Sequence, residues 1–206
     1  MHNFITFHHI PSSKFWFMDE TCFWTGAVTQ RTYVDPATND PSVLQVGNNS
    51  RDTGVVALAA DGSIDATFIE HVPQKTKKMN GHFMITEKGI SGMGTDKMIE
   101  WAHGFGRRHG DPNHMTILVL DALASHKSSV VESTLQSYNI KLFILPPRLA
   151  IVLSPCDNCF FAAMKAQMGR LDTSTRDKKK SVFVDVCARF PAETIRKYFK
   201  HCGWNI

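Results

Sequence analysis

The first third of the chain holds short apolar runs that are separated by turn-forming residues, which is typical of β-strands. Residues 14–24 (KFWFMDETCFW) are aromatic and apolar, with Pro and Ser before them and Gly after them. Residues 54–60 and 63–70 are two further runs separated by an Asp-Gly pair, which is a strong hairpin signal. Residues 31–53, rich in Asp, Asn, Pro, Ser and Thr, are expected to hold a weak strand followed by a loop. We therefore predict an antiparallel meander.

The pattern then changes to a helical period, followed by two continuous apolar runs. Apolar residues recur at spacings of three and four between Thr95 and Gly110, which predicts an amphipathic helix with Thr95 as its N-cap. Residues 115–120 (MTILVL) and 140–145 (IKLFIL) are predominantly apolar, as expected of buried strands, and a helix over about 127–138 joins them. Strand, helix and strand at this spacing predict a parallel crossover unit.

The last quarter of the chain is expected to be largely helical. One helix begins near Pro155, residues 170–180 are polar and charged and are expected to form a loop, and Pro191 opens a final helix that Gly203 ends. The fold class is therefore α/β, with a mixed sheet of five strands. Three strands form the antiparallel meander, two are parallel crossover strands, and helices flank the sheet.

Length and composition fit a single soluble domain. The chain has 206 residues, of which 43% are hydrophobic and 20% charged, and this is too apolar for a disordered tail. No run approaches the roughly 20 apolar residues of a membrane-spanning helix, and residues 1–10 lack the pattern of a secretory signal. We expect an intracellular protein. The formal charge of +4 permits nucleic-acid binding without requiring it.

The five cysteines are expected to be reduced, because their number is odd and a chain of this length needs no disulfide staples. Cys156 and Cys159 form one CxxC motif, which would supply two of the four ligands of a structural zinc site. The adjacent pair His201 and Cys202 would have to supply the other half. Because structural zinc sites usually show two well-spaced ligand pairs, we expect buried or free thiols instead.

Three carboxylates occupy positions that folding alone does not explain. Asp19 lies inside an aromatic strand, Asp121 directly follows a buried strand, and Asp157 lies in the first turn of a helix just past the next strand. A charge at such a place is costly unless it is paired or holds a metal. The carboxyl ends of parallel strands are also where open α/β sheets place their sites. Taken singly, Asp121 and Asp157 are equally well explained as helix-terminal acids.

The order of three segments resembles the catalytic motifs of mariner-superfamily transposases. Residues 15–23 (FWFMDETCF) resemble the first motif, an apolar strand that ends in Asp-Glu-Ser/Thr. Residues 119–128 (VLDALASHKS) resemble the second, in which Leu-Asp-Asn-Ala precedes His-Lys-Ser. Residues 145–147 (LPP) and 153–158 (LSPCDN) resemble the third, in which a Leu-Pro-Pro turn precedes Leu-Asn-Pro-Ile-Glu/Asp-Asn. The matches fall in the family's order and cover most of the chain.

The resemblance implies a ribonuclease-H-like fold with a DDE/D catalytic triad. Carried over position by position, it implies that Asp19, Asp121 and Asp157 are the catalytic, metal-binding acids. Two departures concern the surroundings of these acids. Ala122 stands where the family has Asn, and residues 148–152 (RLAIV) replace its Tyr-Ser-Pro-Asp.

Three acids in one place indicate a bound cation. Carboxylates packed together repel one another and stay ionised only if a cation lies among them. Oxygen ligands suit Mg²⁺ or Mn²⁺, and two such ions about 4 Å apart support in-line displacement at phosphorus. We therefore expect two Mg²⁺ (or Mn²⁺) ions and metal-dependent cleavage and strand transfer of DNA. Asp19 and Asp121 would hold one ion jointly and Asp157 would complete the site, while Glu20 is expected to support the site rather than to bind metal.

Four further residues are candidates for nucleic-acid binding. His126, Lys127, Arg148 and Lys165 lie near the acids in the sequence, where positive side chains would guide the DNA backbone. Solvated surface charge explains the lysines and the arginine as well, and a helix-start cap explains His126. The basic run 176–180 (RDKKK) is expected to lie in an exposed loop, with DNA binding or a nuclear address as its alternatives.

The position of the first motif limits the expected domain content. Transposases of this kind carry helix-turn-helix modules ahead of the catalytic core, whereas Asp19 lies 18 residues after Met1. We therefore expect one catalytic domain over residues 1–206 without such a module. The expected partners are DNA, a separate DNA-recognition protein or domain, and a second copy in a homodimer. Two alternatives stay open: a domesticated or decayed transposase-derived binding module without catalysis, and a plain ribonuclease-H-like nuclease. The expected location is the nucleus in a eukaryote and the cytoplasm otherwise.

Overall fold

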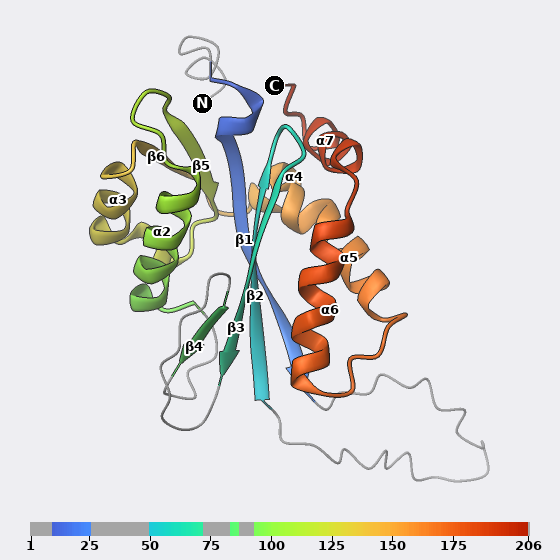
Figure 1. The fold of residues 1–206 in the computed structure, drawn as a ribbon. Coiled ribbons are helices and arrows are strands. Elements are labelled where there is room, and N and C mark those ends of the chain that lie inside the picture. Colours follow the sequence, from blue (N-terminus) through green and yellow to red (C-terminus); the bar gives the residue numbers. More distant parts are fainter. Residues whose placement is uncertain (1–9, 26–49, 72–82, 87–92, 206) are drawn as a thin grey trace, which may run out of the picture.

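The computed structural model describes residues 10–25, 50–71, 83–86 and 93–205. These residues form one mixed sheet with helices on both faces (Figure 1). The strands lie in the order β4-β3-β2-β1-β5-β6. Their bounds are β1 (Phe15–Thr25), β2 (Ser50–Ala59), β3 (Ile64–His71), β4 (Phe83–Thr86), β5 (Thr116–Leu120) and β6 (Ile140–Ile144).

Strands β1, β2 and β3 form the antiparallel meander that the short apolar runs and the Asp-Gly pair predict. The Asp-Gly pair makes the turn between β2 and β3, and Gly62 there adopts a φ of 102°. This backbone conformation favours glycine, and a Cβ at Gly62 would lie 2.5 Å from the backbone oxygen of Ala192. Most of the weak strand and loop expected over 31–53 falls outside the described residues. Strand β2 begins at Ser50, four residues before the apolar run that predicts it.

The crossover unit is also confirmed, because β5 pairs in parallel with both β1 and β6. The sheet has six strands, one more than predicted. The additional strand is β4, which lies parallel to β3 at the edge of the sheet. Its four residues (FMIT) are too few for a periodic pattern to distinguish a strand from a helix segment.

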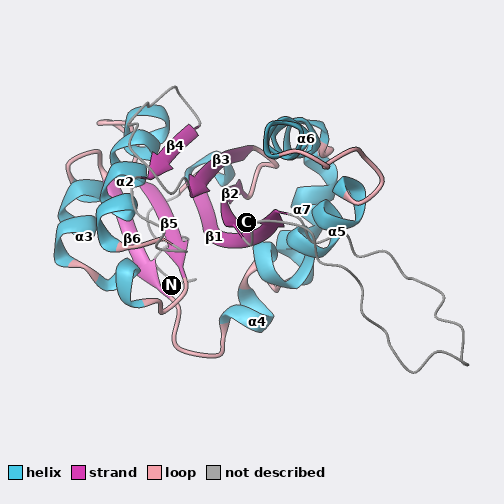
Figure 2. Cartoon of the chain, turned by 90° about the horizontal axis from the view of Figure 1, so that it is seen from below, coloured by secondary structure: helices cyan, strands magenta, loops and turns pink. Residues whose placement is uncertain are grey.

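The helices fall into two groups, one on each face of the sheet (Figures 1 and 2). The first group comprises α2 (Thr95–His109), the 3₁₀ turn η2 (Ala124–Lys127) and α3 (Ser129–Gln136). The second comprises α4 (Ala150–Leu153), the π-helical turn η3 (Cys156–Phe160), α5 (Phe161–Met168), α6 (Arg176–Arg189) and α7 (Ala192–His201). A 3₁₀ turn, η1 (Ser12–Lys14), precedes β1. None of the described helices is long and apolar enough to cross a membrane.

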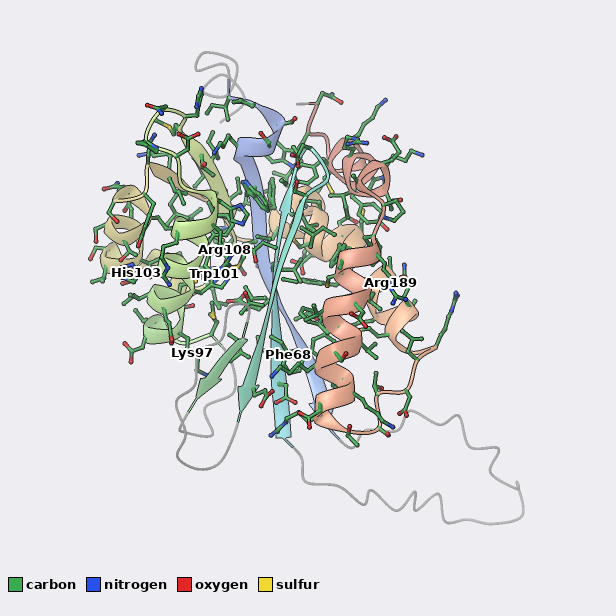
Figure 3. All side chains as sticks on the ribbon, in the orientation of Figure 1. Phe68, Lys97, Trp101, His103, Arg108 and Arg189 are labelled. Carbon is green, nitrogen blue, oxygen red and sulfur yellow. The ribbon has the colours of Figure 1, made fainter. Side chains whose placement is uncertain are left out.

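Alternation along β1 divides the core into two layers. Phe15 and Phe17 belong to the cluster shared with α5, α6 and α7, whereas Trp16 and Met18 belong to the cluster shared with α2 and α3. Each fully buried side chain of this size stabilises the fold by about 2–3 kcal/mol. Figure 3 shows Phe68 of β3 on the α6 side of the sheet, consistent with its place in the first cluster. Because successive β1 residues alternate between faces, Asp19 falls on the α5 side.

Helix α6 replaces the second half of the loop that was predicted over 170–180. Its N-cap is Thr175, whose side-chain oxygen accepts a hydrogen bond from the backbone N–H of Lys178 at 3.3 Å. Lys179 and Phe183 are buried one turn apart and begin the stripe that packs on the sheet. The first turn of α6 is almost entirely charged (RDKKK), so the sequence shows no apolar helical period there. At α2 the sequence analysis is wrong in a smaller respect, since the N-cap is Gly94 and not Thr95.

Candidate active site

Asp19 and Asp121 lie at matched positions of two neighbouring parallel strands. Phe17 of β1 pairs with Val119 of β5, and each acid follows two residues later. Side chains at matched positions of adjacent strands point to the same face. Asp19 is only 7% exposed, whereas Asp121 begins the loop after β5 and is half-buried. The sheet therefore brings the backbones of the first two acids side by side.

Asp157 joins Asp19 from the helical layer. It lies in η3, which packs against β1 and β2, and its carboxyl group hydrogen-bonds with that of Asp19. Burial, together with the charge of Asp157 and this hydrogen bond, raises the pKa of Asp19 to about 9. Two carboxyl groups in contact share a proton unless a cation lies between them. Asp19 and Asp157 therefore form an acid pair.

The residues around η3 hold Asp157 in place. The thiol of Cys156 is fully buried and donates towards the backbone oxygens of Phe17 and Val56, at 3.7 and 3.8 Å. The hydroxyl of Ser154 accepts a hydrogen bond from the backbone N–H of Asp157 at 3.3 Å. Burial, with the charges of both acids, raises the pKa of Cys156 well above its ordinary value, so this thiol is a neutral packing group.

Asp121 is held by His126. The Nδ1 atom of His126 lies 2.7 Å from Oδ1 of Asp121, and its Nε2 atom lies 3.0 Å from Oε1 of Glu20. Burial lowers the pKa of His126, but the hydrogen bonds and charges of the two carboxylates outweigh burial and raise the pKa to about 10. The imidazolium side chain is 0% exposed. His126 thus links the first motif to the second.

This geometry corrects one expectation for DNA binding and supports another for Glu20. Because His126 is buried and both of its ring nitrogens contact carboxylates, it has no donor to offer a DNA phosphate in this arrangement. Glu20 supports the site by accepting a hydrogen bond from His126. The sequence placed Glu20 and His126 in separate motifs, and only the fold shows that they meet.

Asp19 and Asp157 are in contact with each other, whereas Asp121 contacts His126. The three acids therefore do not form one cluster. The carboxylate of Asp121 accepts from His126 and from the backbone N–H of Leu123 at 3.0 Å. Within the described ranges, no three His, Cys, Asp or Glu side chains lie close enough to form a metal site. The residues nevertheless fit a divalent cation. Asp19 and Asp157 are oxygen donors already in contact, and Asp121 starts from the adjacent strand end.

The other candidate DNA contacts are exposed. Lys127 follows His126 and lies near enough to Asp121 that its charge, after the hydrogen bond from His126, helps to lower the pKa of that carboxyl group. Arg148 lies in the turn after the double proline with a φ of 71°, just before α4. Lys165 lies on α5, eight residues beyond Asp157. Their exposure is compatible with binding a polyanion.

The basic run 176–180 is helical and largely engaged with acids of the protein itself. Arg176 Nε lies 3.2 Å from Oδ2 of Asp52 in β2. Lys180 Nζ lies 2.9 Å from Oε1 of Glu70 in β3, and Lys178 pairs with Asp172. Two of these pairs fasten α6 to the sheet. The exposed basic loop predicted from sequence is therefore wrong.

The cysteines do not assemble into the zinc site considered from the sequence. The Cys156 thiol points to the carbonyl oxygens of β1 and β2. Cys159 instead hydrogen-bonds with Cys202, which also accepts a hydrogen bond from Asn158 Nδ2 at 3.7 Å. The two cysteines of the CxxC thus contact different groups, and none of the five cysteines, Cys22 included, is in a disulfide bond.

Comparison of the whole fold with solved structures finds transposases. The Mos1 transposase paired-end complex with the left transposon end matches with a TM-score of 0.63 at 14% identity, over 93% of this chain and 52% of that chain. The catalytic domain of Mos1 mariner transposase matches with a TM-score of 0.59 at 12% identity, over 93% of this chain and 76% of that chain. The Mos1 mariner paired-end complex with Mn matches with a TM-score of 0.59 at 15% identity, over 93% and 53%.

These likenesses confirm the ribonuclease-H-like fold implied by the resemblance to mariner-superfamily transposases. The chain spans about half the length of the Mos1 chains in the complexes with transposon DNA, 52% for the first of them. Among curated proteins no sequence match was found. Residues 65–178, more than half of the chain, match the family described as DDE superfamily endonuclease. The chain therefore belongs to the DDE superfamily endonucleases.

Proposed function

We propose that the chain is a metal-dependent DNA nuclease and strand transferase whose catalytic acids are Asp19, Asp121 and Asp157. The observation that carries the proposal is the contact between Asp19 and Asp157 beside the matched strand position of Asp121. The carboxyl groups of Asp19 and Asp157 are in contact where burial disfavours the ionised form of Asp19. Carboxyl groups with pKa values raised in this way are typical of functional sites.

The proposed site uses two Mg²⁺ or Mn²⁺ ions. The bound ions would activate a water or a 3′-hydroxyl and stabilise the leaving oxygen at phosphorus. Asp19 and Asp157 would give up their shared proton and act as ligands from β1 and η3. Asp121, held by His126 through Oδ1, would complete the ligand set with its other carboxylate oxygen. Mos1 mariner paired-end complexes have been solved with Mn and with Mg, which supports this choice of metal.

DNA is the proposed substrate, because the solved Mos1 complexes include a transposon end and a strand transfer complex. Lys127, Arg148 and Lys165 are the proposed backbone contacts, while His126 has a positioning role. Recognition of a particular DNA end is assigned to a separate protein or domain, and a homodimer is the proposed assembly. The nucleus is the proposed location in a eukaryote.

Nicking of supercoiled plasmid DNA tests the proposal. The wild type is expected to nick or join DNA with Mg²⁺ or Mn²⁺ and to be inert in EDTA. Asp121→Asn is expected to lose at least 100-fold of this activity, since removing one such catalytic group costs about 3 kcal/mol of transition-state stabilisation. Asp185→Asn, at an exposed position of α6, is the matched control. If Asp121→Asn cuts as fast as the wild type, the three-aspartate proposal fails.

The alternatives are separated by two further measurements. A binding module without catalysis would show no Mn²⁺ binding in calorimetry with the wild type and no cleavage of any substrate. A plain nuclease would cut DNA duplexes or RNA in a hybrid without joining ends, and parallel assays with hybrid, hairpin and duplex substrates would show this.

A further inference from the structure

A hollow of about 240 Å³ lies beside the far end of β1, between that strand, α5 and the start of α6. Its lining combines two ammonium groups with one hydroxyl and otherwise mostly apolar or backbone atoms. The residues that line it are Cys22, Phe23, Lys165, Met168, Gly169, Thr173 and Lys179. Neither Asp19 nor Asp157 lines the hollow, and of its lining residues only Lys165 has a role in the function proposed above.

The charges around the hollow favour an anion. Lys165 is exposed on α5, whereas Lys179 is only 7% exposed at the first turn of α6. Burial lowers the pKa of Lys179, while the charge of nearby Asp52 raises it and that of Arg176 lowers it further. Asp52 also binds Arg176 at 3.2 Å. The two side chains that carry charge in the lining of the hollow, Lys165 and Lys179, are both basic, and Asp52 does not line it.

The distance of the hollow from the acids follows from the geometry of two elements. Lys165 lies eight residues beyond Asp157 along a nearly continuous helical segment, a rise of about 12 Å. Cys22 lies three residues beyond Asp19 along β1, a rise of about 10 Å. The two estimates agree although they follow different elements. Phe23 also belongs to the core layer on the α5 side, which is the face that carries Asp19.

This separation matches the repeat of a DNA strand. Phosphates of one duplex strand rise by about 3.4 Å each along the helix axis and also turn about it, so a distance of 10–12 Å corresponds to roughly two nucleotides. Two lysines and a threonine hydroxyl are suited to phosphate oxygens. Contacts of this kind fix the register of the strand without reading its sequence.

We propose that this hollow, the β1–α5–α6 phosphate seat, binds a backbone phosphate of the DNA strand about two nucleotides from the scissile phosphate. The proposal rests on the proposed function for its orientation, but the anion site itself does not require catalysis. Lys165 supplies the exposed charge, and Lys179 supplies a buried charge whose position is fixed by the packing of α6.

Salt-dependent binding of a fluorescein-labelled 12-nucleotide oligothymidylate, followed by fluorescence anisotropy in EDTA, tests the seat. Removing one phosphate contact reduces the slope of log K against log salt by about 0.7 for single strands. Lys165→Met is expected to show this reduction and a loss of affinity of about tenfold, and Lys179→Met a similar one. Lys200→Met, exposed on α7, is the matched control and is expected to keep the wild-type slope.

Single methylphosphonate substitutions locate the phosphate. One neutral linkage is expected to weaken binding of the wild type but not that of Lys165→Met. Because Lys165 is exposed, this variant carries the test even if Lys179→Met unfolds. If Lys165→Met and the control have the same slope and the same methylphosphonate profile, the seat is wrong. If the profile holds but no metal-dependent cleavage occurs, the proposed function fails and the seat stands.

Discussion

His126 Nδ1 lies 2.7 Å from Oδ1 of Asp121, and this bond fixes the carboxylate at the end of β5. The other ring nitrogen binds Glu20 at 3.0 Å, so one buried imidazolium neutralises an acid from each of two motifs. A buried charge bound on both sides is costly to disrupt, because its removal leaves two carboxylates without their partner. The arrangement makes His126 a positioning residue for the second acid.

Replacement of His126 by alanine is expected to lower the free energy of unfolding by about 2–4 kcal/mol at pH 7. Urea denaturation measures this loss, and His201→Ala, at the exposed end of α7, is the control. His126→Gln keeps one hydrogen-bonding group and is expected to recover part of both stability and nicking activity. A His126→Ala variant as stable as the control would contradict the role assigned to the imidazolium.

Asp19 gives the protein a characteristic dependence on pH. Its pKa of about 9 in the folded state lies above the ordinary 3.8, so the folded state holds a proton that the unfolded chain releases. The stability associated with this group is complete below about pH 4 and is lost progressively as the pH rises through about 9. We therefore expect Asp19→Asn to be more stable than the wild type at pH 8, by about 1–2 kcal/mol.

Thermal unfolding in EDTA between pH 5 and 9 measures this difference. The melting temperature of Asp19→Asn is expected to depend less on pH than that of the wild type. Addition of Mn²⁺ should raise the melting temperature of the wild type and leave that of Asp19→Asn nearly unchanged. A ligand at 100 times its Kd stabilises by about 2.7 kcal/mol. Equal stabilisation of both proteins by Mn²⁺ would place the metal away from Asp19.

The features that depend on neighbouring residues in the chain could be predicted from the sequence. The aromatic and apolar run over 15–23 placed Asp19 inside a strand, and the apolar run before Asp121 placed that acid at a strand end, as found. The contact between Glu20 and His126 was missed because it joins residues 106 positions apart. Helix α6 was missed because the charges of its first turn form ion pairs with sheet residues such as Asp52, which no local pattern reveals.

A second buried ion cluster fastens α2 to the sheet and predicts sensitivity to acid. Asp65 of β3 accepts from Arg108 Nε at 2.9 Å, and His109 Nε2 lies 2.6 Å from the same oxygen. Figure 3 shows Arg108 on α2 beside the sheet. Burial raises the pKa of Asp65, but the bonds from His109 and Arg108 outweigh it and lower the pKa below 3.8. The stability that Asp65 contributes is therefore present above about pH 4 and is lost as the pH falls through its folded-state pKa.

Asp65→Asn is expected to cost about 2–4 kcal/mol at pH 7, because Arg108 loses its buried carboxylate partner and His109 loses the carboxylate that it contacts. The cost should shrink as the pH falls below 3.8 towards the lower pKa of the folded state, because the unfolded wild-type chain then binds a proton that folding must release. Urea denaturation at pH 7 and pH 3 measures both values, with Asp185→Asn as the exposed control. A cost that is the same at both pH values would mean that the charge of Asp65 is not what holds α2.

The turn between β2 and β3 predicts a strong dependence on Gly62. Its φ of 102° is strained for any residue with a Cβ, and that Cβ would lie 2.5 Å from the backbone oxygen of Ala192 at the start of α7. Gly62→Ala is expected to lower the free energy of unfolding by about 2–4 kcal/mol, because left-handed strain and overpacking add. Gly94→Ala is the matched control, since a Cβ at Gly94 has no neighbour within 4 Å. Equal melting temperatures for the two variants would show that the turn and α7 shift apart freely. A large loss confined to Gly62→Ala would show that the hairpin and the last helix are packed as one unit.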